Sequence, residues 1–220
     1  MAALPQDPTL DEIRVGLAPL IAANAAFDGW TDTARDTAAD TAGLDRDVAA
    51  VAFPGGAIDM IDAWFAHVDA AMAEALPPER LGTMKVRAKI AGLVEARLAV
   101  LAPHREALRR ALAILAMPQN LMRAAKLGWR AADLMWRAAG DTATDYNHYT
   151  KRTILAGVYG ATITVFLDDE SAGYADTRAF LDRRIEGIMR FEKAKAGLIS
   201  RTEYRPSLSR FIGRLRYPVV

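Results

Sequence analysis

The positions of glycine and proline constrain this fold most, because they interrupt a chain otherwise rich in strong helix formers. Alanine, leucine, arginine and glutamate dominate between the breaks, and no alternating strand pattern is flanked by hairpin turns. The sequence therefore predicts an all-α protein whose helices end at these breaks. The breaks lie at Gly29, Gly43, Pro54-Gly55-Gly56, Pro77-Pro78, Pro103, Pro118, Gly140, Gly173 and Pro206.

The stretches between the breaks give the expected helices. The helix expected at 57–76 is clearly amphipathic, because its large apolar residues recur at intervals of three and four. With 52% hydrophobic and 25% charged residues, the chain can bury a real core, and its lack of cysteine excludes disulfides and thiolate chemistry. The apolar stripe of 57–76 consists of Ile58, Ile61, Phe65, Val68 and Met72. The predicted helices span 10–27, 32–42, 45–52, 57–76, 80–101, 104–116, 119–139, 145–167, 174–198 and 207–216.

The first three helices resemble the DNA-binding headpiece of TetR-type repressors. A threonine-capped helix begins after Thr31, Gly43-Leu44 supplies the tight turn, and Asp45–Phe53 occupies the place of the recognition helix. Its charge does not suit DNA, because residues 28–53 hold six aspartates and two arginines. We therefore expect no nucleic-acid binding and a headpiece that serves as a structural cap.

Charge is distributed unevenly along the chain. Residues 1–62 contain three basic and eleven acidic residues, a net charge of −8, whereas residues 183–220 contain ten basic and three acidic residues, a net charge of +7. An anionic partner is therefore expected at the C-terminal end.

The stretch from about 97 to 170 closely resembles the coenzyme Q biosynthesis protein nine family, which consists of TetR-fold accessory proteins of ubiquinone synthesis. The resemblance extends over nearly the whole chain. Its hallmarks are Leu115-Ala116-Met117-Pro118-Gln119-Asn120, Met135-Trp136, Ala139-Gly140-Asp141, Thr144-Asp145-Tyr146-Asn147 and Tyr149-Thr150-Lys151-Arg152.

This resemblance implies a non-catalytic protein that binds an isoprenoid quinone intermediate or another lipid in an apolar pocket. It also implies association with a demethoxyubiquinone hydroxylase-like partner. The chain departs from the family at His148-Tyr149, where members often carry Trp-Tyr. That pair lies on the surface implicated in hydroxylase binding, so the resemblance does not decide which hydroxylase is the partner. The predicted lipid or partner patch comprises Asp133, Met135, Trp136, Tyr146, His148 and Tyr149.

The residues alone leave two interpretations of this region. Trp129 and Trp136 are seven residues apart and share a helix face, and a buried aromatic stripe and a lipid-lined tunnel give the same pattern. Gly140 is expected to end one helix, and Asp141 or Thr144 to cap the next.

No catalytic motif is evident. None of His67, His104 and His148 lies in a metalloprotease or nucleophile-elbow context. Asp145 and His148 share a helix face, but no second pair completes a metal site. The run from Asp168 to Glu170 favours a solvated turn over an acid–base pair. We expect no catalytic residues, no metal site and no cofactor beyond a bound lipid.

The last predicted helix, 207–216, combines a compact apolar stripe with arginines on the opposite side. This pattern is typical of a helix lying on an anionic membrane surface, although docking on protein is the alternative. The predicted membrane-binding residues are Leu208, Arg210, Phe211, Ile212, Arg214 and Leu215.

Three parts are expected: a degenerate headpiece at 1–55, a lipid-binding helical body at 56–200 and an amphipathic basic tail at 201–220. The absence of a signal sequence suggests a cytoplasmic bacterial protein, peripherally associated with the inner membrane. Gly157 and Gly160 would permit close helix approach in a homodimer. The alternative function is a TetR-type, ligand-responsive transcriptional regulator.

Overall fold

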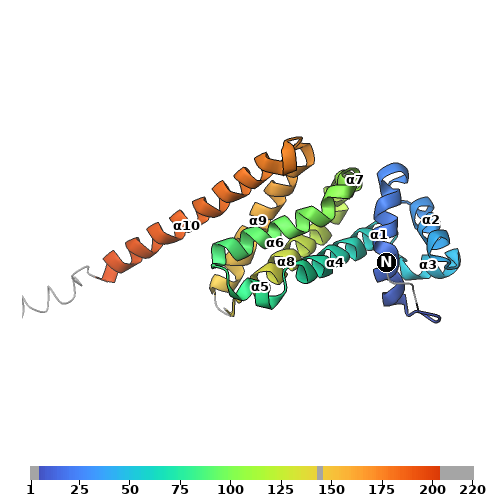
Figure 1. Cartoon of the computed structure of the whole chain (residues 1–220), viewed down its shortest axis with the longest axis horizontal. Coiled ribbons are helices and arrows are strands. Elements are labelled where there is room, and N and C mark those ends of the chain that lie inside the picture. Colours follow the sequence, from blue (N-terminus) through green and yellow to red (C-terminus); the bar gives the residue numbers. More distant parts are fainter. Residues whose placement is uncertain (1–4, 143–145, 204–220) are drawn as a thin grey trace, which may run out of the picture. The chain divides into compact units, whose positions relative to one another are not determined.

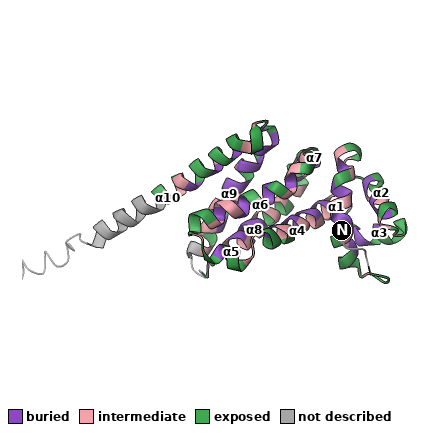
Figure 2. Ribbon diagram, in the orientation of Figure 1, coloured by how far each residue is buried: buried purple, intermediate pink, exposed green. Residues whose placement is uncertain are grey.

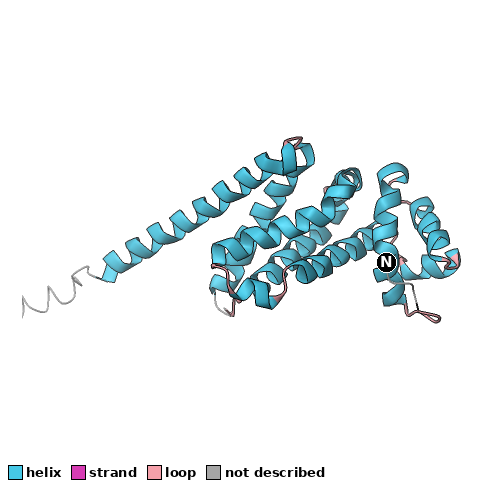
Figure 3. Cartoon of the chain, in the orientation of Figure 1, coloured by secondary structure: helices cyan, strands magenta, loops and turns pink. Residues whose placement is uncertain are grey.

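The computed structural model describes residues 5–142 and 146–203, and this part of the chain consists of helices and short connections, with no strand (Figures 1 and 3). The predicted all-α class is confirmed. The helices are α1 (Leu10–Asp28), α2 (Asp32–Ala42), α3 (Arg46–Ala52), α4 (Ala57–Ala75), α5 (Pro78–Gly82), α6 (Val86–Leu101), α7 (Arg105–Leu115), α8 (Leu121–Ala138), α9 (Tyr146–Asp168) and α10 (Ala175–Glu203).

Contacts divide the chain into two compact units, residues 1–181 and 182–220, with the boundary inside α10. The first unit holds the headpiece and the helical body, and every site described below lies within it. The predicted division at residues 55 and 200 stays a prediction.

The headpiece helices begin and end within one residue of the positions expected from the sequence. The Thr31 side chain accepts a hydrogen bond from the Ala34 backbone at the start of α2, and Gly43 ends α2 in the left-handed region with φ 68°. Asp45 accepts from the backbone N–H groups of Asp47 and Val48 at the start of α3. These caps satisfy backbone groups that a helix end leaves without partners, so short helices can persist here.

The predicted stripe of α4 is buried and joins several helices. Ile61, Phe65, Val68 and Met72 are buried, and they are accompanied by Met60 and Trp64. Ile58 is only half-buried. Helix α4 packs against α1, α6, α7 and α8, so it connects the headpiece to the body.

Two tryptophans form the joint between headpiece and body. The ring centroids of Trp30 and Trp64 lie 5.2 Å apart, and both side chains are buried. The Trp30 indole N–H donates to the carbonyl of Ala107 in α7 at 2.9 Å. The indole therefore fills the joint and satisfies its polar atom at the same time.

The prediction of one continuous helix at 80–101 is wrong. The chain forms α5 and α6, separated by Thr83 to Lys85. The Thr83 hydroxyl donates to the Arg80 carbonyl, and the Met84 backbone N–H donates to that of Leu81. These local bonds compete with the helical pattern just after Gly82, a weak helix former.

The prediction of a solvated turn after α9 is also wrong for Asp169, which is buried. Its carboxylate accepts hydrogen bonds from the backbone N–H and hydroxyl of both Ser171 and Thr177. Burial alone would raise the pKa of Asp169, but these four bonds outweigh it and hold the pKa well below its usual value. Asp169 therefore fixes the connection between α9 and α10.

Among the described residues, no single helix has both the length and the hydropathy needed to cross a membrane. Helices α3 and α4 pass that test only as a pair, which is bent by 80°.

Replacing Trp30 with alanine should lower the free energy of unfolding by about 3–5 kcal/mol, because it empties the joint. Phe27, in the last turn of α1, is 85% exposed and provides the control, and its replacement with alanine should change the free energy of unfolding by less than about 0.5 kcal/mol. Urea denaturation measures both. Equal effects of the two substitutions would contradict the assigned joint.

Candidate lipid-binding site

The helical body encloses a cavity of about 570 Å³. Small-ligand pockets usually occupy about 300–1,000 Å³, so this volume suits a sizeable molecule. Several lining residues, including Leu121 and Gly160, are exposed, so the cavity opens to the surface. The lining residues come from α4, α6, α7, α8 and α9, together with Ala116 directly after α7. They are Phe65, Arg97, Leu112, Leu115, Ala116, Leu121, Ala124, Ala125, Leu127, Gly128, Trp129, Ala131, Thr153, Ala156, Tyr159, Gly160 and Ile163.

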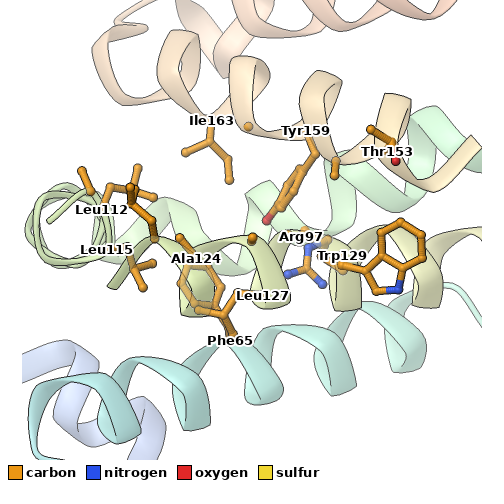
Figure 4. Close-up of a pocket in the computed structure, with 17 residues that line it drawn as sticks. Phe65, Arg97, Leu112, Leu115, Ala124, Leu127, Trp129, Thr153, Tyr159 and Ile163 are labelled. Atoms are coloured by element: carbon orange, nitrogen blue, oxygen red, sulfur yellow. The ribbon is translucent and has the colours of Figure 1, made fainter. Parts of the chain in front are cut away.

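The two sides of the cavity differ in chemistry. Figure 4 shows Leu112 and Leu115 on one side and Trp129 on the other, with Arg97 and Tyr159 between them. The leucine side offers only apolar surface. The cavity therefore suits a molecule with a long apolar part and a smaller polar part.

Arg97 is buried, and its charge is balanced by a network on neighbouring helices. Its guanidinium pairs with Asp69 of α4, and the Arg130 Nε of α8 lies 3.0 Å from the same carboxylate. Arg130 also pairs with Asp62 at 2.5 Å. Two guanidinium groups and two carboxylates therefore lie together, which makes the burial of Arg97 tolerable.

The predicted patch is divided by the structure into a buried part and an exposed part. Met135 is fully buried, and Trp136 is half-buried with its indole N–H donating to the Lys151 carbonyl at 3.0 Å. Asp133 pairs with Arg152 at 2.6 Å and with Arg137 at 2.8 Å. These three patch residues contribute to the contact between α8 and α9.

Arg152 is the centre of this contact. Its guanidinium is buried between Asp133 and Asp141, at 2.6 and 3.1 Å, and it also donates to the His148 carbonyl. Lys151 pairs with Asp141 at 2.6 Å. We call Asp133, Asp141, Lys151 and Arg152 the α8–α9 clasp.

The clasp depends on ionised carboxylates. Burial alone would raise the pKa of both Asp133 and Asp141. Hydrogen bonds outweigh burial, from Arg152 and Arg137 at Asp133 and from Lys151 and Arg152 at Asp141, so both pKa values are lowered.

Gly140 ends α8 as predicted. With φ 91°, it adopts a backbone conformation that favours glycine, and its N–H donates to the Arg137 carbonyl. The Asp141 N–H donates to the Trp136 carbonyl, which completes a Schellman motif. This turn delivers the Asp141 carboxylate to the clasp.

His148 and Tyr149 of the patch form an aromatic cluster with Trp129, which the predicted patch did not include. The Trp129 ring lies 6.0 Å from that of Tyr149 and 6.3 Å from that of His148, and Tyr149 is 61% exposed. Because Trp129 also lines the cavity, the cluster adjoins the cavity wall. We call Trp129, His148 and Tyr149 the aromatic cluster.

Some predicted residues lie beyond what the structure describes. The side chain of Tyr146 and the whole predicted membrane helix, from Leu208 to Leu215, are outside the described residues. Within the described part of the chain, no group of three His, Asp or Glu side chains is placed to hold a metal ion.

Sequence reasoning missed Arg97 and Tyr159, the two buried polar residues of the cavity. The sequence signal for Arg97 is weak, because 86–101 also contains Arg87, Lys89 and Glu95. The position of Tyr159 beside it depends on how α9 packs against α6, which no local pattern reveals.

The headpiece surface does not suit DNA. Arg46, the only arginine of α3, binds Asp40 through two hydrogen bonds of 2.9 and 2.5 Å. Asp47, Val48 and Val51 of this short helix are exposed as well. Figure 2 shows exposed residues along α2 and α3. Neither carboxylates nor valines neutralise phosphates.

These observations define the class of protein: an all-α chain with a TetR-like fold and an apolar cavity in its helical body. A TetR transcriptional regulator from Nitrosomonas europaea ATCC 19718 has a similar structure, with a TM-score of 0.64 and 20% sequence identity, covering 79% of this chain and 96% of that one. This likeness concerns the fold.

Residues 121–192, which include α8, α9 and the whole clasp, match the COQ9 family model. The chain is 36% identical to the mitochondrial ubiquinone biosynthesis protein COQ9 of Rattus norvegicus over 168 residues, which cover 73% of this chain and 54% of the relative. The corresponding protein of Bos taurus is 33% identical over 73% of this chain and 52% of its own length. The chain belongs to the COQ9 family, and it spans about half the length of these curated relatives.

The clasp should make stability depend on pH in acid. Because the folded-state pKa values of Asp133 and Asp141 are lowered, their contribution is complete above the unfolded value of about 3.9 and is lost as the pH falls through the folded values. Asp141→Asn should lower stability at pH 6. Below about pH 4, the variant should lose less further stability than the parent protein as the pH falls. Asp7→Asn, at an exposed position, is the control. Thermal unfolding from pH 6 to pH 2 measures both, and identical acid profiles for parent and Asp141→Asn would contradict the clasp.

The headpiece should bind DNA no more tightly than about 10⁻⁴ M at physiological salt, the weak end of non-specific binding. Titration with random duplex and with the upstream region of the gene measures this. The double variant Asp47→Lys, Val51→Lys makes two exposed positions of α3 basic and should gain salt-dependent affinity. Submicromolar, sequence-selective binding by the parent would support the regulator instead.

Proposed function

We propose that this chain acts in ubiquinone biosynthesis as a non-catalytic accessory protein that binds an isoprenoid quinone intermediate. The observation that carries the proposal is the apolar cavity of about 570 Å³, which is lined in part by α8 and α9, the helices that match the COQ9 family model. The pathway is taken from the curated relatives, which are ubiquinone biosynthesis proteins. Long isoprenoid tails are almost insoluble in water, so enzymes that modify their rings benefit from a protein that shields the tail.

We further propose that the bound lipid is presented to a demethoxyubiquinone hydroxylase-like partner at the aromatic cluster. Aromatic residues are enriched at the centres of protein interfaces, and Tyr149 is exposed there. Trp129 belongs to both the cluster and the cavity wall, so a partner bound at the cluster would lie beside the ligand. His148 replaces a residue that is often tryptophan in the family, which leaves a smaller aromatic surface for the partner.

The source of the lipid in this proposal is a membrane surface, reached through the basic C-terminal tail. A homodimer formed through α9 is consistent with Gly157 and Gly160, because a Cβ atom added at either glycine would meet no atom within 4 Å.

These two glycines provide a matched test of the cavity. Gly160 lines it and Gly157 does not, although both lie exposed on α9. Gly160→Leu should fill part of the cavity and reduce the affinity for a ubiquinone with a short isoprenoid tail at least tenfold, whereas Gly157→Leu should leave it unchanged. Both substitutions should raise helix stability slightly, since glycine is a poor helix former.

Displacement of a neutral apolar dye, N-phenyl-1-naphthylamine, measures the affinities. Sedimentation of both variants shows whether a dimer through α9 has been altered, which would affect the two substitutions alike. Equal ubiquinone affinity in parent and Gly160→Leu would place the ligand outside this cavity and contradict the proposal.

A further inference from the structure

Two buried polar atoms on residues that line the cavity lack a well-formed hydrogen bond. Arg97 Nε and the Tyr159 hydroxyl are buried and make no hydrogen bond that meets normal distance and angle limits with any described residue. Both residues line the cavity, and Figure 4 shows the Tyr159 hydroxyl directed toward Arg97. The two groups still act on each other: burial alone would lower the pKa of Arg97, but Tyr159 and Asp69 raise it. A hydroxyl beside a guanidinium keeps its own hydrogen to donate, and buried polar groups are nearly always satisfied, so this pair indicates a ligand that supplies an acceptor.

Arg97 and Tyr159 hold each other in position. The Arg97 Cζ atom lies over the Tyr159 ring at 4.9 Å from its centroid, and Asp69 holds the other side of the guanidinium. The two donors are therefore oriented before any ligand arrives, which reduces the cost of ordering them on binding.

The charge around these donors selects the kind of acceptor. The positive charges of Arg97 and Arg130 are already balanced by Asp62 and Asp69. A buried carboxylate or phosphate would add an uncompensated negative charge, which is costly in an apolar cavity. A carbonyl or ether oxygen accepts hydrogen bonds without adding charge.

We propose that Tyr159 and Arg97 donate hydrogen bonds to a neutral oxygen on the ring of the bound lipid, so that the ring lies between them and Trp129. The apolar tail then extends toward Leu112 and Leu115. This inference rests on the proposed function and adds the orientation of the ligand and the group that recognises its ring. It also places the ring, which is the part that a hydroxylase modifies, at the side of the cavity that adjoins the aromatic cluster.

The test is the isosteric substitution Tyr159→Phe. It removes one hydroxyl that makes no well-formed hydrogen bond within the described protein and keeps the ring under Arg97, so the chain should still fold. The ligand-free variant should be more stable, with a Tm raised by about 2–4 °C, because an unsatisfied buried polar group is lost. Tyr174→Phe removes a hydroxyl outside the cavity and is the control.

Three probes separate ring recognition from tail binding in the dye-displacement assay: ubiquinone with two isoprene units, the hydrocarbon farnesene and oleic acid. Tyr159→Phe should weaken ubiquinone binding about two- to tenfold, the range of one hydrogen bond, and should leave farnesene binding unchanged. Tyr174→Phe should change neither.

The outcomes distinguish the inference from the proposed function. If the parent binds ubiquinone and farnesene, and Tyr159→Phe binds both as the parent does, the ring assignment is wrong while lipid binding stands. If Tyr159→Phe loses oleic acid affinity rather than ubiquinone affinity, the acceptor is a carboxylate and the inference is overturned. If the parent binds neither isoprenoid probe, the proposed function fails and the inference fails with it.

Discussion

Two buried arginines hold the helical body together around its cavity. Arg97 joins α6 to α4 through Asp69, and Arg152 joins α9 to α8 through Asp133 and Asp141. Removing one partner of such a pair leaves a buried charge without compensation and commonly costs about 3–5 kcal/mol. The helices that line the cavity are thus fixed by directional polar contacts, which frees the apolar side chains between them from having to fill the space completely.

Because the charged contacts position the helices, the helical body can be stable and still keep a large cavity. Apolar helices alone tend to close around a void, since unfilled volume forfeits packing energy. The charged contacts of Arg97 and Arg152 join α6 to α4 and α9 to α8, and they keep these helices in place. A lipid that enters the cavity would supply the missing contacts, and its ring oxygen would satisfy the donors that the protein leaves open.

Much of the fold could be predicted from the sequence because its determinants are local. The caps at Thr31 and Asp45, the glycine turn at Gly43 and the stripe along α4 each depend on residues within a few positions. The break between α5 and α6 was missed, because hydrogen bonds of Thr83 and Met84 decide it rather than a proline. The sequence also predicted a solvated Asp169. Its four hydrogen-bond donors, on Ser171 and Thr177, reach the carboxylate only because of the way the chain turns between α9 and α10.

The candidate site was harder to predict because it depends on tertiary contacts. Sequence placed Met135, Trp136 and Tyr149 in one patch, yet Met135 is fully buried and Tyr149 is exposed. Successive residues on a helix point in different directions, so a motif identifies a region without separating its buried face from its exposed one. Arg97 and Tyr159 are far apart in sequence and meet only when α6 and α9 pack.

The central claim is that the cavity holds an isoprenoid quinone or its precursor. The most direct measurement is mass spectrometry of lipids extracted from the protein after native purification from the organism that makes it, with an unrelated helical protein purified in parallel. The account predicts an isoprenoid molecule with an oxygenated ring, enriched in near-stoichiometric amount. A water-soluble effector in its place, or lipids no different from those of the parallel protein, would contradict the account.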